Sequence, residues 1–245
     1  MRHRIVTELR EHFAGLLILA SVIAGGLWGF VELADEVADG ETRSFDRAVM
    51  LALRSTSDVN DPLGPAWIEQ VARDITSLGG APVLVLITLA AVGFLLFIRH
   101  WGAAIFVAVS VIGGTLISNF LKGWFDRPRP DLVPHAVEVT SASFPSGHAM
   151  LAMITYLTLG AVLAEIERSR IVRIYILVWA VLLALLVGLS RVYLGVHWPT
   201  DVLAGWCIGS SWALLCGAIA LWLRSRGVIE AVDATARERP RGSHH

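Results

Sequence analysis

The chain has 245 residues, of which 55% are hydrophobic and 17% charged, and its mean hydropathy is +0.64. Such a composition is too apolar and too poor in charge for an ordinary water-soluble domain, so the expected solvent is the lipid bilayer. The formal net charge of -1 is uninformative by itself, and no basic run indicates a nucleic-acid partner.

Apolar runs without charged residues recur along the whole chain. A helix that crosses a hydrocarbon core of about 30 Å, at about 1.5 Å per residue, needs roughly 20 residues. The runs that meet or approach this length are 13–30, 81–98, 102–121, 149–163, 174–189 and 202–223. The fourth run is short unless residues 145–148 and Ala164 extend it. The sequence therefore predicts an all-α fold, a six-transmembrane-helix bundle in a single membrane-embedded domain over residues 1–240.

The two ends of the chain need separate interpretation. The first apolar run follows a basic segment, as in a cleaved signal peptide, but residues 31–39 offer no clear small-residue cleavage site. A retained first helix also makes the number of spans even. Residues 241–245, Arg-Gly-Ser-His-His, are typical of an expression-tag remnant.

Basic residues are distributed unevenly between the loops. Arginines gather before the first run, after the second, between the fourth and fifth, and after the sixth, whereas acidic residues dominate segment 31–80. Because arginine and lysine favour cytoplasmic loops, we expect both termini in the cytoplasm. The chain is then a multi-pass protein of a bacterial inner (cytoplasmic) membrane, with its remaining loops facing the periplasm or the cell exterior.

The first outer loop, 31–80, contains a pattern of its own. Apolar residues recur there at helical spacing, namely Trp67, Ile68, Val71, Ile75 and Leu78. This pattern predicts an interfacial amphipathic helix. A weaker pattern of the same kind involves Phe45, Val49, Leu51 and Leu53. Such helices can serve as a lid or lipid entry, or simply shield the bundle.

The next outer loop begins with three cations close together. Lys122, Arg127 and Arg129 lie where the third span ends, which violates the positive-inside bias. Taken alone, they could merely anchor the helix end among lipid headgroups.

The start of the fourth span is a candidate anion site. Pro145, Ser146, Gly147 and His148 have a helix-start composition. Serine can cap the helix, glycine lets an oxyanion approach the backbone, and the positive end of the helix dipole favours phosphate. The pattern is common, and His148 could equally face lipid headgroups.

The last outer loop runs from Ser190 and Arg191 to His197 and Asp201. Residues four apart lie side by side on a helix, so the Asp201 carboxylate could keep one ring nitrogen of His197 protonated and leave the other as a nucleophile. On its own the pair would more often be a structural cap.

The three segments together fit phosphoryl transfer. The nonbridging oxygens of a phosphoryl group need fixed positive charge and N–H donors. In-line displacement also needs a nucleophile on one side and a proton donor behind the leaving oxygen. Cations, a helix start and two histidines on one predicted membrane face supply all of these.

These blocks resemble the signature of the type 2 phosphatidic acid phosphatases. That signature reads Lys-x6-Arg-Pro, Pro-Ser-Gly-His and Ser-Arg-x5-His-x3-Asp, and it stands here in order within residues 122–201. The resemblance implies that His197 attacks phosphorus, that Asp201 orients it, and that His148 protonates the departing lipid oxygen. It further implies a phosphohistidine intermediate and a phosphate site formed by Lys122, Arg129, Ser146, Gly147 and Arg191. Arg127 lies outside the strict spacing and could serve a second phosphoryl group.

No metal and no cofactor are expected, because fixed cations would repel a divalent ion. We expect a membrane lipid substrate such as undecaprenyl diphosphate, phosphatidylglycerol phosphate or phosphatidic acid. A lipid phosphotransferase would use the same site, and a vanadate-dependent haloperoxidase has similar motifs. A lipid transporter, from a different class, should carry more polar residues near the membrane midplane.

Overall fold

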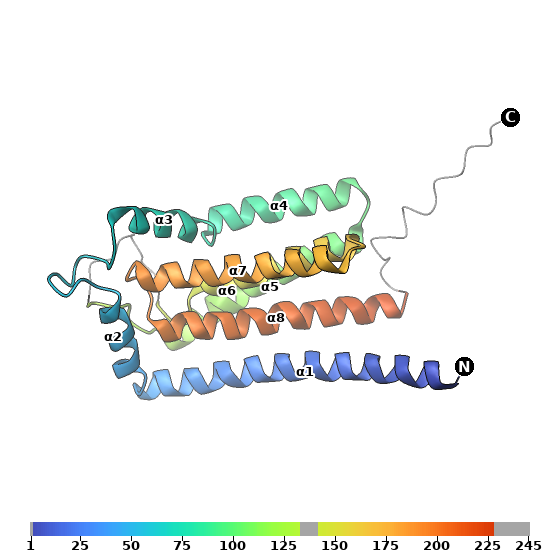
Figure 1. Ribbon diagram of the computed structural model, residues 1–245, viewed down its shortest axis with the longest axis horizontal. Coiled ribbons are helices and arrows are strands. Elements are labelled where there is room, and N and C mark those ends of the chain that lie inside the picture. Colours follow the sequence, from blue (N-terminus) through green and yellow to red (C-terminus); the bar gives the residue numbers. More distant parts are fainter. Residues whose placement is uncertain (1, 133–141, 228–245) are drawn as a thin grey trace.

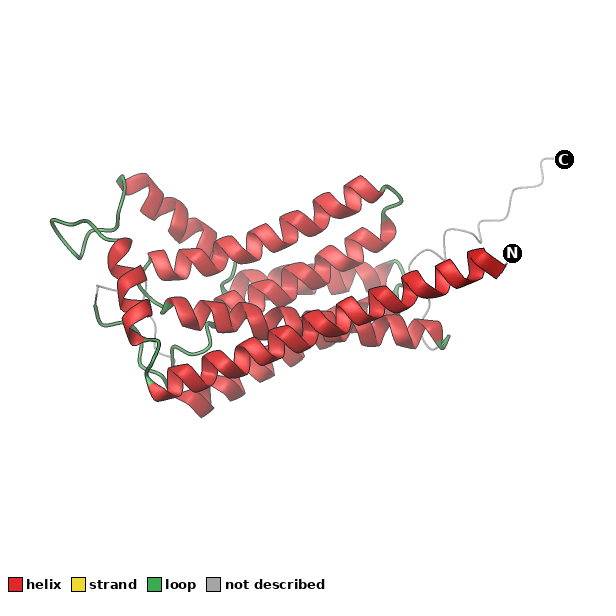
Figure 2. Cartoon of the chain, turned by 60° about the horizontal axis from the view of Figure 1, so that its bottom comes forward, coloured by secondary structure: helices red, strands yellow, loops and turns green. Residues whose placement is uncertain are grey.

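The computed structural model describes residues 2–132 and 142–227, with side chains from residue 15 onward, so the expected tag at 241–245 lies outside the described residues. The described residues form helices and no strand (Figure 2). The predicted all-α fold is therefore confirmed. The helices are α1 (Arg2–Asp39), α2 (Arg43–Ala52), α3 (Ala66–Ser77), α4 (Ala81–Phe97), α5 (Trp101–Phe125), α6 (Gly147–Ile166), α7 (Arg170–Tyr193) and α8 (Pro199–Ser225).

The number of membrane spans differs in one respect from the prediction. Among the described residues, 5 helices are long and apolar enough to cross a membrane: α1, α5, α6, α7 and α8. The expected second span, α4, has only 17 residues. At about 1.5 Å per residue it falls short of a bilayer core. It passes the same test only together with α3, from which it is bent by 46°, so the count is five, or six if this pair is one span.

The long helices run side by side, and their ends define two ends of the bundle (Figure 1). At the end we call the loop end, α1, α5 and α7 finish, and α4, α6 and α8 begin. The short helix α2 lies across this end in both views (Figures 1 and 2). The start of α1 and the end of α8 lie together at the opposite end of the bundle.

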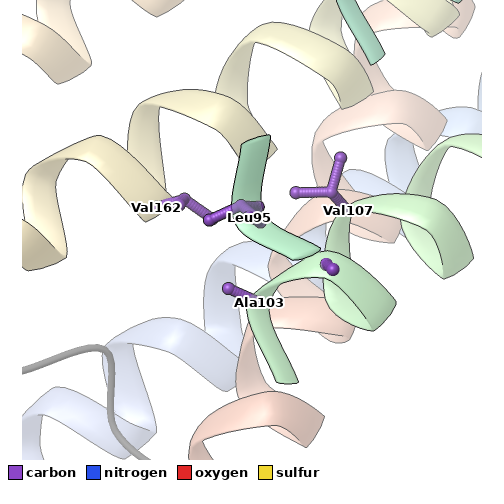
Figure 3. Packing of buried hydrophobic residues seen from close by; sticks show 5 residues of the cluster. Leu95, Ala103, Val107 and Val162 are labelled. Atoms are coloured by element: carbon purple, nitrogen blue, oxygen red, sulfur yellow. The ribbon is translucent and has the colours of Figure 1, made fainter. Parts of the chain in front are cut away.

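Helix α6 is the most buried of the spanning helices and α1 the least. Away from the loop end, Leu95 of α4, Ala103 and Val107 of α5 and Val162 of α6 pack into one cluster (Figure 3). The outer faces of α4, α5 and α7 expose large apolar side chains, among them Leu86, Phe97, Leu116, Phe120, Ile171 and Val178. Side chains of this kind fit a surrounding of lipid tails rather than water.

Helix α3 occupies the segment for which the sequence predicts an interfacial amphipathic helix. Its Ala72 and Thr76 are buried, and Ile75 packs against the core formed by α6 and α7. Trp67 and Val71 remain exposed on the other face. The weaker pattern corresponds to α2, whose buried residues are Asp46 and Met50.

Helices α6 and α8 approach each other closely at the loop end. The backbone N–H of Ser146, just before α6, donates to the carbonyl oxygen of Asp201 in α8 at 2.9 Å. A side chain at Gly205 would bring its Cβ to 2.8 Å from the Ser146 oxygen and 3.2 Å from the Met150 nitrogen. Gly205 and, four residues later, Gly209 therefore allow these two helices to pack closely through small residues.

This contact predicts different effects of the same substitution along α8. Gly205→Ala should lower the free energy of unfolding by about 1–3 kcal/mol, because the added methyl group overlaps backbone atoms that cannot rotate away. Gly217→Ala is the matched control, since apart from the backbone of its own helix no described atom lies within 4 Å of its Cβ position. Unfolding in detergent would measure both variants, and equal midpoints would contradict the packing described here.

Candidate active site

The predicted site residues gather at the loop end from segments far apart in the sequence. Each lies at or near a helix end: Lys122 in the last turn of α5, Arg127 and Arg129 in the segment after it, Ser146, Gly147 and His148 at the start of α6, Arg191 in the last turn of α7, and His197 and Asp201 at the start of α8.

His197 and Asp201 form a buried pair. The Nδ1 atom of His197 lies 3.3 Å from Oδ2 of Asp201, and the side chains are 1% and 0% exposed. The same Oδ2 accepts a hydrogen bond of 2.9 Å from the backbone N–H of Trp198. The first turn of α8 thus fixes the carboxylate, and the carboxylate fixes the imidazole.

The contacts of His197 define which ring nitrogen carries its proton. Arg129 Nη1 lies 3.1 Å from Nε2 of His197 and donates to the Val196 carbonyl oxygen at 2.7 Å. A guanidinium can only donate, so Nε2 must be unprotonated and Nδ1 carries the proton toward Asp201. Burial lowers the pKa of His197 to about 4, with Asp201 opposing the shift and Arg129 and Arg191 adding to it. At neutral pH, Nε2 therefore offers a lone pair.

Two further side chains, Ser143 and Arg127, hold the Asp201 carboxylate, and the sequence analysis did not identify Ser143. Ser143 Oγ donates to Oδ2 of Asp201 and lies 3.3 Å from Nδ1 of His197. Ser143 stands three residues before Ser146, but no spacing rule distinguishes it from other loop serines. Its neighbour Phe144 is fully buried against Phe30 and Phe125, which fixes this segment.

Arg127 has a different environment from the one expected of a phosphate ligand. Its Nη1 donates to Oδ1 of Asp201 at 2.5 Å and to Thr200 Oγ1 at 2.9 Å. Its Nη2 lies 2.7 Å from Oδ2 of Asp46 in α2. The structure thus engages Arg127 with two carboxylates, and its service to a second phosphoryl group stays a prediction. Asp46, one of many acidic residues in segment 31–80, carried no sequence signal.

Arg191 is a buried cation of another kind. Its side chain is 2% exposed, and Nη1 donates to Thr76 Oγ1 of α3 at 3.0 Å. Its Nε is buried without a hydrogen-bond partner, and within residues 15–132 and 142–227 it makes no ion pair with a carboxylate. Burying a charge is costly unless it is compensated, so this position favours an anionic ligand.

The start of α6 lies beside these cations. Ser146 is fully buried, and its Oγ accepts from the Ala149 N–H at 3.5 Å as the N-cap. Lys122 Nζ donates to the Ala142 carbonyl oxygen at 2.8 Å and lies 3.9 Å from where a Cβ on Gly147 would stand. The Gly147 backbone is therefore open toward the ammonium group, at the positive end of the helix dipole.

His148, the next residue of α6, is half-buried and is influenced by the charges of Arg191, Lys122 and Arg129. The corner between α3 and α4 covers it from one side, since a Cβ on Gly79 would lie 3.5 Å from the His148 Cβ. The second histidine thus faces the same cationic environment as the first.

A cavity of about 700 Å³ adjoins this cluster on the side of Arg127. It lies between the end of α1, helix α2 and the segment after α5, and its lining includes Arg43, Arg47, Trp124 and Trp198. A volume of this order fits a small ligand or a headgroup.

The arrangement places a buried, neutral histidine beside a group of buried cations at one end of a bundle of apolar helices. Residues 103–225 match the model of the PAP2 superfamily. The chain belongs to this superfamily, in agreement with the resemblance of its three sequence blocks.

Named relatives and a solved structure agree with this membership. Phosphatidylglycerophosphatase B of Bacillus subtilis is 34% identical over 187 residues, which cover 74% of this chain and 85% of the relative. Lipid A 1-phosphatase of Rhizobium etli is 29% identical over 167 residues, or 63% and 65% of the two chains. The crystal structure of a transmembrane PAP2-type phosphatidylglycerolphosphate phosphatase from Bacillus subtilis has a TM-score of 0.76 at 28% identity, covering 83% of this chain and 98% of its own. The fold is that of a transmembrane PAP2 protein.

The protonation of His197 can be tested directly. In protein with 15N-labelled histidines, the signal that disappears in His197→Gln should remain that of a neutral, Nδ1-protonated ring down to about pH 5, since its pKa is lowered to about 4. The unfolded chain takes up this proton near pH 6.5, so the folded state loses stability as the pH falls from about 6.5 toward 4. A titration midpoint near 6.5 in the folded protein would contradict this assignment.

Proposed function

We propose that this PAP2 membrane protein hydrolyses a lipid phosphate through a phosphohistidine at His197. Two neighbouring features carry the proposal. The Nε2 atom of His197 has a lone pair, and close to it lies a buried cation, Arg191, that makes no ion pair with a carboxylate among the described residues. A phosphoryl group supplies both an electrophile for the first and an anion for the second.

The reaction would proceed in two displacements. In the first, Nε2 of His197 bonds to phosphorus as the bond from phosphorus to the lipid oxygen breaks, and His148 gives that oxygen a proton. In the second, His148 takes a proton from water, the oxygen of that water bonds to phosphorus, and the bond to Nε2 breaks. Asp201 balances the positive charge that the His197 ring acquires in between.

The remaining residues of the signature would hold the phosphoryl oxygens. We assign this role to Lys122, Arg129 and Arg191 by charge, and to Ser146 and the Gly147 backbone by their place at the start of α6. These fixed charges do the work that a metal ion performs in other phosphatases, and they oppose binding of a divalent cation. We therefore propose a reaction without a metal.

We propose phosphatidylglycerol phosphate as the substrate to be tested first. The similarity to Bacillus subtilis phosphatidylglycerophosphatase B supports this choice, and the engagement of Arg127 with two carboxylates gives no reason to prefer a diphosphate. The lipid tail would lie outside the bundle. The distribution of arginines supports an orientation with both termini in the cytoplasm, α3 at the outer interface and the site facing outward.

The two histidines should respond differently to substitution. His197→Ala should lower kcat at least about a thousandfold on every substrate, because no nucleophile remains. His148→Ala should lower kcat by about 10²–10⁴ on a lipid phosphate and much less on an aryl phosphate, whose leaving group needs no proton. Phosphate release by the purified variants in detergent measures both. Near-normal activity of His197→Ala would overturn the proposed mechanism.

A panel of substrates tests the lipid assignment. Phosphatidylglycerol phosphate, undecaprenyl diphosphate, phosphatidic acid and a soluble sugar phosphate should be compared with and without EDTA. We expect kcat/KM to be highest for a lipid, because the anchored tail positions phosphorus against His197, and we expect EDTA to have no effect. Equal efficiency on the sugar phosphate contradicts a lipid substrate, and metal-restored activity after EDTA contradicts the metal-free reaction.

A further inference from the structure

Asp46 is a buried carboxylate that the reaction described above does not use. It lies in α2, is 0% exposed and belongs to the first outer loop, far in sequence from the catalytic blocks. Its Oδ2 contacts Arg127 Nη2 at 2.7 Å and accepts from Thr200 Oγ1 at 2.7 Å, while Oδ1 accepts from the Thr200 N–H at 3.0 Å. Every one of these contacts leads toward the start of α8.

Through Arg127 the contacts continue to the nucleophile. Arg127 stands between the two carboxylates, with Nη2 on Asp46 and Nη1 on Oδ1 of Asp201. Since Arg127 takes Oδ1, the other oxygen of Asp201 is left for Nδ1 of His197. A continuous chain of buried polar contacts thus runs from α2 to the His197 ring.

The charges of this series of contacts affect the His197 ring as well as the packing of α2. Asp201 and Arg127 alone would form a formally neutral pair, whereas Asp46, Arg127 and Asp201 together carry a formal charge of -1. When Nε2 of His197 attacks phosphorus and Nδ1 keeps its proton, the ring becomes cationic. A net negative cluster stabilises that state, and more strongly inside the protein than it would in water.

We propose that Asp46 is a positioning residue for His197, which acts through Arg127 to keep Asp201 oriented and its negative charge uncompensated. This rests on the proposed role of His197 as the nucleophile. Asp46 also accepts the Thr200 N–H in the first turn of α8, where the N-cap Trp198 has no side-chain oxygen. A merely structural role would consist of this capping bond.

Asp46→Asn separates the two roles, because the amide oxygen can still accept from Thr200 while the charge is removed. We expect kcat to fall about tenfold to a hundredfold, as when a carboxylate that orients a histidine is removed, with KM changed less than about twofold. The matched control is Asp58→Asn, an exposed aspartate of the same loop whose Oδ1 contacts only the Asn60 N–H among the contacts described, and it should leave both constants unchanged.

Coupling to Arg127 is tested by a double variant. Arg127→Gln should also lower kcat, and Asp46→Asn combined with Arg127→Gln should lose no more than Arg127→Gln alone, within about twofold. The 15N signal of the His197 ring should shift in Asp46→Asn, although its neighbours Asp201, Ser143, Arg129, Arg191 and His148 are unchanged. Thermal unfolding in detergent establishes that each variant is folded.

Three results would overturn the proposal: an unchanged kcat in Asp46→Asn, additive losses in the double variant, or an unmoved His197 signal. The ring signal is read without turnover, so it reports the coupling even if the reaction differs from the one proposed. Activity retained in His197→Ala would instead count against the proposed function and would leave the measured coupling standing.

Discussion

The site depends on the close approach of the starts of α6 and α8. A hydrogen bond from Ser146 to the Asp201 carbonyl oxygen joins the two helix starts, and Gly205 leaves room for it. Without this contact, the candidate anion site at the start of α6 and the histidine before α8 would be separate features. Backbone atoms of the two helices meet directly because Gly205 has no side chain, so the two halves of the site can move little relative to each other.

Charges of opposite sign are separated across the His197 ring. On the Nδ1 side lie Asp201, Ser143 and, through Arg127, Asp46. On the Nε2 side lies Arg129, with Arg191 close enough to influence the ring. A neutral imidazole between the two sets is polarised toward its Nε2 side, which is where a phosphoryl group would be attracted. Burial keeps the two sets from being screened by water.

The parts of this site that were predictable are local in sequence. His197 and Asp201 are four residues apart, so helical geometry alone predicts their contact, and the capping role of Ser146 follows from its place before an apolar run. Asp46 lies 81 residues from Arg127, and Thr76 lies 115 from Arg191. Only the packing of α2 and α3 on the bundle brings these pairs together.

The same reason explains why two features could not be derived from the sequence. Arg127 was interpreted from its neighbours in sequence, whereas its partners come from α2 and α8. The second span was counted from an apolar run, but whether α4 crosses alone or with α3 depends on the bend between them. In both cases the local pattern identified the kind of residue, but it could not show which distant segments pack against it.

The apolar outer faces of α4, α5 and α7 have a kinetic consequence. If these faces lie against lipid tails, a lipid that reaches the loop end has travelled by lateral diffusion within a thin sheet rather than through bulk water. The relevant concentration is then its mole fraction among the surrounding lipids. For the proposed lipid phosphatase, diluting the substrate with an inert lipid would then slow turnover, whereas diluting the whole vesicle suspension would leave the rate per protein nearly unchanged.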